Sequence, residues 1–215
     1  MIIYLVRHAS AGEHLANPKK DEKRPLDADG IEQCGYMGRA LAALNAQPDV
    51  VISSPLKRAT QTASLIANEI GFEGKLQLEA AMRPEASFPE FRRMLEKYAK
   101  HEAIMVVGHN PNFSDFLGRT IAGSGERAHV DLRKGSVAKI ESKQKKYVLD
   151  WLLTPRLAKA AADANVGESA SSSVQNGNGE FEIPDEYLSL RARSLPSDDQ
   201  EAGRTTKSRP KTSRK

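Results

Sequence analysis

Three short apolar runs constrain the fold of this chain more than any other feature of its sequence. The runs are Ile2–Val6, Val50–Ile52 and Ile104–Val107; each is rich in β-branched residues and is followed at once by polar residues. Short, uninterrupted apolar runs of this kind are typical of buried parallel strands. The sequence therefore predicts three such strands within the first half of the chain.

The segments around these runs predict the other elements of the fold. Apolar residues recur at helical spacing in 31–44, 59–70, 91–98 and 113–121. Alternating strands and helices predict an α/β fold, a three-layer α/β/α sandwich with a mostly parallel sheet. Two later segments, Ser136–Ser142 and Tyr147–Leu153, are joined by a short Lys-rich turn and predict a hairpin that adds antiparallel strands to the sheet edge.

The composition changes after the hairpin, and this change defines the predicted domain boundaries. We assign residues 1–155 to one compact domain, 156–180 to a flexible linker and 181–215 to a disordered basic tail. The linker is rich in Ser, Asn and Gly and holds few large apolar residues, so it cannot bury enough surface to offset the entropy of ordering.

Charge and composition exclude several classes of protein. The net charge is +4, but residues 191–215 contain eight Lys or Arg and three Asp or Glu, so that residues 1–190 carry a net −1. The domain is therefore not a basic body that binds nucleic acid. No apolar run reaches the ~18 residues of a membrane span, no signal peptide is recognised, and the single Cys34 excludes an internal disulfide. We expect a soluble cytoplasmic protein without a membrane partner.

The residues that follow the three predicted strands carry the chemistry. Arg7 and His8 end the first run, residues 53–58 with Arg58 follow the second, and His109 follows the third. In an open parallel sheet, groups just beyond the carboxyl ends of the strands converge on one crevice. Guanidinium groups bind phosphate oxygens through paired hydrogen bonds, and a neutral imidazole supplies a nitrogen nucleophile. These residue types point to a phosphoryl group as the target.

Four motifs in a fixed order resemble those of the histidine phosphatase superfamily, also called the phosphoglycerate mutase-like family. The motifs are LVRHASA, RPLDADG, SSPLKRATQTA and VVGHNP, and the resemblance covers residues 1–153. Within this family the chain is most similar to the short SixA-type phosphohistidine phosphatases. The resemblance implies a phosphoglycerate mutase-like fold with a minimal cap.

The resemblance also implies roles for individual residues. His8 matches the nucleophile that forms a covalent phosphohistidine, and His109 matches the second histidine of the pocket. Arg7 and Arg58 match the phosphate-binding arginines, and Arg24 matches an additional arginine near the phosphate in SixA-type members. The chain departs from the family in one place, because the usual Arg-His-Gly becomes Arg-His-Ala.

The general acid is not determined by the motifs. Many relatives supply a glutamate from the segment after the second helix, where this chain offers Glu85 and Glu90, and no spacing compels either. Glu85 is our candidate, but the acid stays unassigned. A weak or missing acid favours a phosphohistidine substrate, because imidazole is a much better leaving group than an alkoxide. The short segment 72–102 leaves little chain for a lid, and an open site suits a phosphorylated protein.

We therefore expect a phosphohistidine phosphatase that acts on proteins, such as a histidine-containing phosphotransfer domain, and that needs no metal or other cofactor. The alternatives are a phosphatase of small phosphomonoesters and a phosphate-recognition module without turnover. A metal site formed by His8, His14 and His109 lacks ligating carboxylate spacing. His14, His101 and His129 are interpreted as structural or exposed, and no oligomeric state is predicted.

Overall fold

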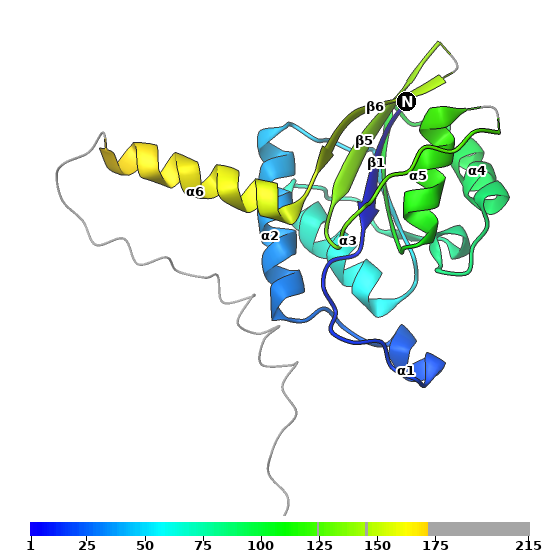
Figure 1. Cartoon of the computed structure of the whole chain (residues 1–215), viewed down its shortest axis with the longest axis horizontal. Helices are drawn as coiled ribbons and strands as arrows, with labels where there is room; N and C mark the ends of the chain where they lie inside the picture. Colours follow the sequence, from blue (N-terminus) through cyan, green and yellow to red (C-terminus); the bar gives the residue numbers. More distant parts are fainter. Residues whose placement is uncertain (124, 145, 172–215) are drawn as a thin grey trace, which may run out of the picture. The chain divides into compact units, whose positions relative to one another are not determined.

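The computed structural model describes residues 1–123, 125–144 and 146–171 of the chain. The described residues form a six-stranded sheet with the strand order β3-β2-β4-β1-β5-β6 (Figure 1). The strands are β1 (Ile2–Arg7), β2 (Val50–Ser53), β3 (Gln77–Leu78), β4 (Ala103–Gly108), β5 (Val137–Lys143) and β6 (Lys146–Leu153). The helices are α1 (Pro18–Glu22), α2 (Ala28–Ala43), α3 (Lys57–Glu69), the 3-10 helix η1 (Ala80–Met82), α4 (Phe88–Lys97), α5 (Asn112–Ala122) and α6 (Pro155–Ser171).

The three strands predicted from the apolar runs lie side by side in the sheet and run parallel. β4 lies between β2 and β1, and its register pairs Gly108 with Arg7 and Val107 with Ser53. The carboxyl ends of all three strands are therefore level. The predicted hairpin is also confirmed, because β5 pairs antiparallel with β1 and β6 pairs antiparallel with β5.

Helices cover both faces of the sheet, which confirms the three-layer α/β/α prediction. Alternate residues of β1 point to opposite faces: Tyr4 and Val6 pack in one core cluster, Ile3 and Leu5 in the other. The first cluster includes buried residues of α2, α3 and α6, and the second includes buried residues of α4 and α5. All six residues of β4 are buried, as expected for a central parallel strand.

Helix α6 corrects the predicted linker. The sequence led us to expect a flexible linker over 156–180, whereas residues 155–171 form a helix. Its first part is rich in alanine, the residue with the highest helix propensity. Ala158 is buried in the first core cluster, and Lys159 Nζ lies 3.1 Å from Glu32 Oε1 on α2. Residues 172–180 of the linker and the predicted tail at 181–215 lie outside the described residues.

Three short elements have no apolar periodicity and were not predicted. They are α1, β3 and η1. The α1 sequence, PKKDE, is entirely polar except for its proline, and the helix begins where the Asn17 side chain accepts the Lys20 N–H. Among the described residues, no helix is long and apolar enough to cross a membrane.

Two of the three glycines of helix α2 differ in their surroundings, and this generates a prediction. A Cβ on Gly30 would overlap the Ser10 carbonyl oxygen, on the segment that follows β1. We expect Gly30→Ala to lower the free energy of unfolding by about 1–3 kcal/mol, because the backbone must move to relieve the overlap. Urea denaturation of the purified variant measures the change.

Gly35→Ala in the same helix is the matched control. A Cβ on Gly35 would lie 3.2 Å from Nη1 of Arg39, which is the end of a flexible side chain. We expect this variant to gain about 0.5–1 kcal/mol, the usual difference between alanine and glycine in a helix. Equal effects at the two positions would show that the close approach to Ser10 does not constrain α2.

Candidate active site

The level carboxyl ends of β1, β2 and β4 bring two histidines together. His8 follows β1, and its backbone N–H donates to the Gly108 carbonyl of β4 at 2.9 Å. His109 directly follows β4, and the two imidazole rings lie with their centroids 4.9 Å apart at an angle of 57°. Both side chains are buried, with relative exposures of 8% for His8 and 2% for His109. The predicted convergence of these two residues is therefore present.

The hydrogen bond of His8 determines which of its nitrogens can react. Nδ1 lies 2.7 Å from the carbonyl oxygen of Ala9. Because a carbonyl can only accept, Nδ1 carries the hydrogen, and Nε2 of the neutral ring keeps its lone pair. The local backbone thus leaves Nε2 as the ring nitrogen with an available lone pair.

His109 is oriented by a residue from the end of β2. The Ser54 hydroxyl lies 2.9 Å from Nε2 of His109 and also accepts the Leu56 N–H at 3.4 Å, so its own hydrogen can be donated to the ring. In this arrangement Nδ1 of His109 carries a hydrogen. That Nδ1 is buried and has no hydrogen-bond partner in the part of the chain that the structure describes.

Burial and nearby cations keep both imidazoles neutral. Burial is the main reason that the pKa of His8 falls to about 3; the hydrogen bond to Ala9 opposes this shift, and the guanidinium groups of Arg58 and Arg7 add to it. Burial also lowers the pKa of His109 to about 2, with further contributions from His8 and Arg58. Both rings are therefore uncharged at neutral pH, as a nitrogen nucleophile requires.

The two arginines predicted to bind phosphate lie beside these rings. Arg7 Nη1 donates to the Leu132 carbonyl at 2.9 Å, and Arg58 Nη1 donates to the Asp21 carbonyl at 2.9 Å. The Nε atoms of both arginines are buried and lack a partner among the described residues. With Nδ1 of His109, three buried nitrogens of this region thus have unused hydrogen-bonding capacity. A buried polar group without a partner is rare, and an anion would satisfy these donors.

Asp21 joins the third predicted arginine to the site, and sequence reasoning missed it. Its Oδ1 lies 2.8 Å from Arg24 Nε, and its Oδ2 lies 3.2 Å from Arg58 Nη1. Arg24 also donates to the carbonyls of Ala11 and Gly12. Asp21 is only 5% exposed, although its sequence neighbourhood of alternating charges is typical of a solvated surface. No local signal distinguishes it.

Ala9 stands where the family pattern Arg-His-Gly has glycine, and the backbone conformation at this position accepts an alanine. Positive φ angles of non-glycine residues occur, within the described residues, at Asn45 and Gln144. Ala9 is buried, and its N–H donates to the Thr62 hydroxyl of α3 at 3.1 Å. Alanine is therefore accommodated after His8 without the left-handed conformation that requires glycine.

The two candidate acids differ in their contacts. Glu90 closes the capping box of α4, where its Oε2 accepts the N–H of Ser87 at 2.7 Å and the hydroxyl of Ser87 at 2.6 Å. Glu85 is exposed, and its carboxylate lies 3.4 Å from Arg83 Nη1, which also contacts Glu22 at 2.8 Å. The contacts of Glu90 identify it as a capping residue. The role of Glu85 as general acid stays a prediction.

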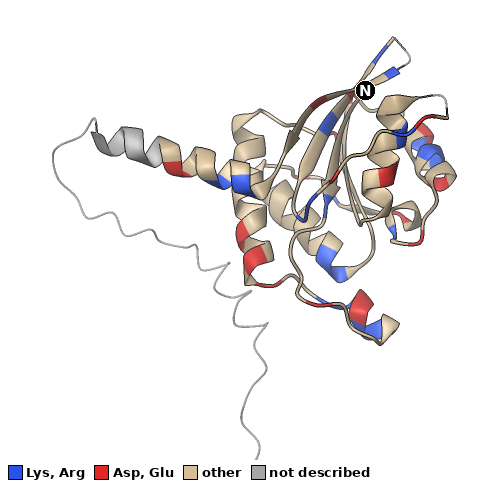
Figure 2. Cartoon of the chain, viewed as in Figure 1, with Lys and Arg blue, Asp and Glu red and all other residues tan. Residues whose placement is uncertain are grey.

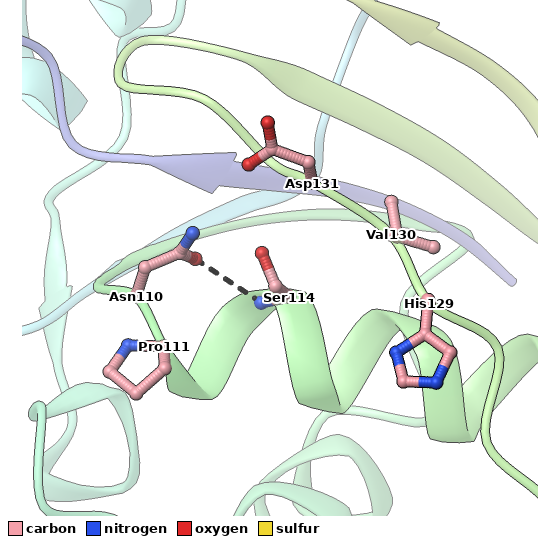
Figure 3. Close-up of a pocket in the computed structure, with 6 residues that line it drawn as sticks. All are labelled: Asn110, Pro111, Ser114, His129, Val130 and Asp131. Carbon is pink, nitrogen blue, oxygen red and sulfur yellow. Dashed lines mark hydrogen bonds between the residues drawn. The ribbon is translucent and has the colours of Figure 1, made fainter.

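A pocket of about 560 Å³ adjoins the second histidine (Figure 3). Asn110 and Pro111 lie at the start of α5 and Ser114 lies on its first turn, while His129, Val130 and Asp131 lie on the segment that runs alongside the helix. The Asn110 side chain accepts the Ser114 N–H at 3.2 Å and donates to the Leu132 carbonyl at 2.9 Å. Arg7, one of the predicted phosphate-binding residues, donates to the same carbonyl, so Leu132 links the pocket residue Asn110 to Arg7.

The surroundings of the site are rich in cations. Figure 2 shows basic residues on α1, at the first turn of α3 and on the segment that leads into β5. The exposed cations in these segments are Lys19, Lys20, Lys57, Arg127, Arg133 and Lys134, and they outnumber the exposed carboxylates Glu22, Glu126 and Asp131. Such a distribution favours the approach of an anionic substrate. Within the described residues, no group of three or more His, Cys, Asp or Glu side chains is arranged to hold a metal ion.

Comparison with known proteins agrees with this geometry. A model of the histidine phosphatase superfamily (branch 1) matches residues 3–103, a range that includes Arg7, His8, Arg24 and Arg58. This part of the chain therefore resembles the histidine phosphatase superfamily. Its fold matches that of the protein histidine phosphatase SixA complexed with tungstate, with a TM-score of 0.65, 18% identity and coverage of 73% of this chain and 98% of that chain.

Further relatives come from a wide range of organisms. A putative SixA of Agrobacterium tumefaciens has a TM-score of 0.60 at 22% identity and covers 72% of this chain and 97% of its own. An uncharacterized protein of Picosynechococcus is 28% identical over 145 residues, 66% of this chain and 86% of its own length. The mitochondrial serine/threonine-protein phosphatase Pgam5 of Drosophila pseudoobscura pseudoobscura is 40% identical over 88 residues, which are 40% of this chain but only 29% of Pgam5.

The lowered pKa values of the two histidines predict an acid-sensitive fold. In the unfolded chain a histidine takes up a proton near pH 6.5, whereas His8 and His109 stay neutral in the folded chain down to about pH 3 and about pH 2. Their contribution to stability is therefore complete above pH 6.5 and decreases as the pH falls towards 3. Each histidine contributes a slope of up to about 1.4 kcal/mol per pH unit in this window.

Urea denaturation between about pH 7 and pH 5.5 tests this, because carboxylates contribute little in that range. The variant His8→Gln cannot take up the proton at this position, so its free energy of unfolding should depend about half as steeply on pH as that of the wild type. An unchanged slope would show that His8 is protonated in the folded protein.

Asp21 generates a second prediction for this site. Burial alone would raise the pKa of Asp21, but the Leu15 N–H and the guanidinium groups of Arg24 and Arg58 hold it below its usual range. Asp21→Asn leaves two arginines without their counter-charge, so we expect a loss of about 1–3 kcal/mol in the free energy of unfolding. Inorganic phosphate should restore part of the loss, because it supplies negative charge to the same arginines.

Glu22→Gln, one residue further along α1, is the matched control. Glu22 is exposed and pairs with Arg83, so its removal should change the stability by less than about 0.5 kcal/mol, with or without phosphate. Thermal melts with and without phosphate provide the measurement. If phosphate stabilises the wild type and both variants to the same extent, Asp21 does not compensate the phosphate-binding arginines.

Proposed function

We propose that this protein is a phosphatase that transfers a phosphoryl group from its substrate to Nε2 of His8 and then to water. The observation that carries the proposal is the combination of an imidazole whose Nε2 is unprotonated with three buried nitrogens that lack partners within the described part of the chain. The nucleophile and the donors for the phosphoryl oxygens lie in one buried region. A covalent intermediate of this kind divides a difficult hydrolysis into two easier transfers.

The arginines and His109 would act on the charge of the transferred group. Guanidinium groups of Arg7, Arg58 and Arg24 bind the phosphoryl oxygens, and their low-dielectric surroundings strengthen each contact as the transition state forms. The ring Nδ1–H of His109 donates to the same oxygens. The Ala9 carbonyl keeps Nδ1 of His8 protonated while the ring carries the phosphoryl group. The arrangement provides positive charge without a metal ion.

We propose phosphohistidine in proteins, such as a histidine-containing phosphotransfer domain, as the substrate. Glu90 caps helix α4, and the exposed Glu85 pairs with Arg83. The contacts of these two carboxylates therefore do not indicate that either is a strong proton donor. An imidazole leaving group needs less help from an acid than an alkoxide does. The cation-rich surroundings of the site would attract a phosphorylated protein. A cytoplasmic location remains a prediction.

Similarity to Pgam5 favours a second candidate, the removal of phosphate from serine or threonine in proteins. Pgam5 is described as a serine/threonine-protein phosphatase, and the matching segment is 40% identical. An alkoxide leaving group would then require an acid, and Glu85 is the carboxylate that the sequence offers. Removal of Glu85 should matter for phosphoserine substrates and should have little effect on phosphohistidine.

The experiment that tests the proposal compares wild type and His8→Ala on three substrates. These are a phosphohistidine-containing phosphotransfer protein, a phosphoserine peptide and p-nitrophenyl phosphate. We expect the wild type to prefer phosphohistidine and His8→Ala to lose activity by on the order of 10³-fold or more on every substrate. Residual activity above about a tenth of wild type would contradict the assigned nucleophile.

Two further measurements sharpen this test. A phosphoenzyme trapped by acid-free quenching should form on the wild type and be absent from His8→Ala, and its absence from both would favour a phosphate-recognition module. Activity should persist in EDTA. A loss of activity that added Mg²⁺ or Zn²⁺ restores would overturn the metal-independent mechanism.

A further inference from the structure

The pocket beside Asn110 holds an acidic group close to the phosphate-binding arginine. Asp131 lines this pocket on the segment opposite α5, directly before Leu132, whose carbonyl accepts from both Arg7 and Asn110 (Figure 3). The Asp131 charge is near enough to Arg7 to raise its pKa against the lowering effect of burial. A phosphoryl group bound by Arg7 would therefore lie near Asp131.

The remaining lining residues suit a flat, cationic ring. Pro111 and Val130 supply apolar surface, and the Ser114 hydroxyl accepts the Leu132 N–H at 3.1 Å and retains its own hydrogen for a ligand. Asp131 is exposed, and its one ion pair among the described residues is a contact of 3.4 Å to Arg133 Nε. Its carboxylate thus remains available to a ligand in the pocket.

We propose that this pocket is the leaving-group subsite and that Asp131 selects phosphohistidine by stabilising the protonated imidazole of the substrate. The inference rests on the proposed phosphatase function. It makes Asp131 a specificity-determining residue for nitrogen-linked phosphoryl groups.

The chemistry of the transfer explains why a carboxylate is useful at this position. The phosphorylated imidazole binds with a proton on its other ring nitrogen, and the ring is then cationic. His8 Nε2 forms a bond to phosphorus while the substrate's phosphorus–nitrogen bond breaks, and that electron pair stays on the ring. The imidazole leaves neutral, with its proton in place. A carboxylate nearby raises the pKa of the bound ring and so increases the reactive fraction.

A phosphoester gains nothing from this carboxylate. Its leaving oxygen develops negative charge, which Asp131 would repel rather than stabilise. Among the described residues, Arg7 on β1 and Arg133 on its own segment lie near the Asp131 carboxylate, and His129 lines the same pocket. Both arginines stay charged throughout the working pH range. A change in substrate preference with pH would therefore come from the imidazole of the substrate or from His129. The variants Asp131→Asn and His129→Gln distinguish these two sources.

The test uses the full chain with a phosphohistidine peptide and with p-nitrophenyl phosphate. Asp131→Asn should lower kcat/KM for the peptide by about three- to tenfold, in keeping with an exposed charge, and change that for p-nitrophenyl phosphate by less than about twofold. The peptide-specific loss should shrink at low pH, where the ring is protonated without help. Asp131→Glu should keep most of the peptide activity, and His129→Gln should keep the pH dependence of the wild type.

The control is Asp150→Asn, an exposed carboxylate that pairs with Lys139 on the neighbouring strand, and it should leave both activities unchanged. Equal losses on both substrates in Asp131→Asn, or no loss on either, would overturn the inference while the phosphatase assignment stands. If the wild type hydrolysed p-nitrophenyl phosphate but not the peptide, the phosphohistidine assignment would fail and this inference with it. Failure of the wild type on all substrates would instead refute the proposed function.

Discussion

Burial of positive charge beside two imidazole rings is the constraint on which the rest of the site depends. Arg7 and Arg58 lie with His8 and His109 at the carboxyl edge of the sheet, where both rings are shielded from water. Protonating either ring would add a cation to an already positive, poorly solvated region, so the rings stay neutral. A bound substrate anion would also lower the cost of burying this positive charge, because it would accept hydrogen bonds from the unpaired donors and neutralise the arginines.

Asp21 makes this arrangement stable before any anion binds. Buried guanidinium groups without a counter-charge would destabilise the fold, and Asp21 contacts both Arg24 and Arg58. It can do so only because the short helix α1 lies next to the start of α3. The helix has little apolar surface, so it is held mainly through these polar contacts and the Asn17 cap. The region around Arg24 and Arg58 and helix α1 therefore stabilise each other.

The segment after β1 is held in place by the helices on one face of the sheet. The Ala9 N–H donates to Thr62 on α3, the Ser10 N–H donates to the Gln33 side chain on α2, and the Ser10 hydroxyl donates to Asp27. On the other side, the Gly135 N–H donates to the carbonyls of Arg7 and His8. This last contact joins His8, the proposed nucleophile, to the segment that also contributes Leu132 and Asp131. The proposed nucleophile and the proposed leaving-group pocket thus share one backbone framework.

The sequence by itself determined the three parallel strands, the main helices, the hairpin, the presence of Arg7, His8 and His109 at strand ends and that of Arg58 in the segment after the second strand. These features depend on local patterns, because burial of a strand or of one helix face is recorded in neighbouring residues. Only the tertiary structure decided the role of Asp21, whose partner Arg58 lies 37 residues away, and the tautomer and lowered pKa of His8. It also revealed α6 and the pocket at Asp131. Ion pairs, desolvation and pockets arise between segments distant in the chain, so no local pattern of residues encodes them.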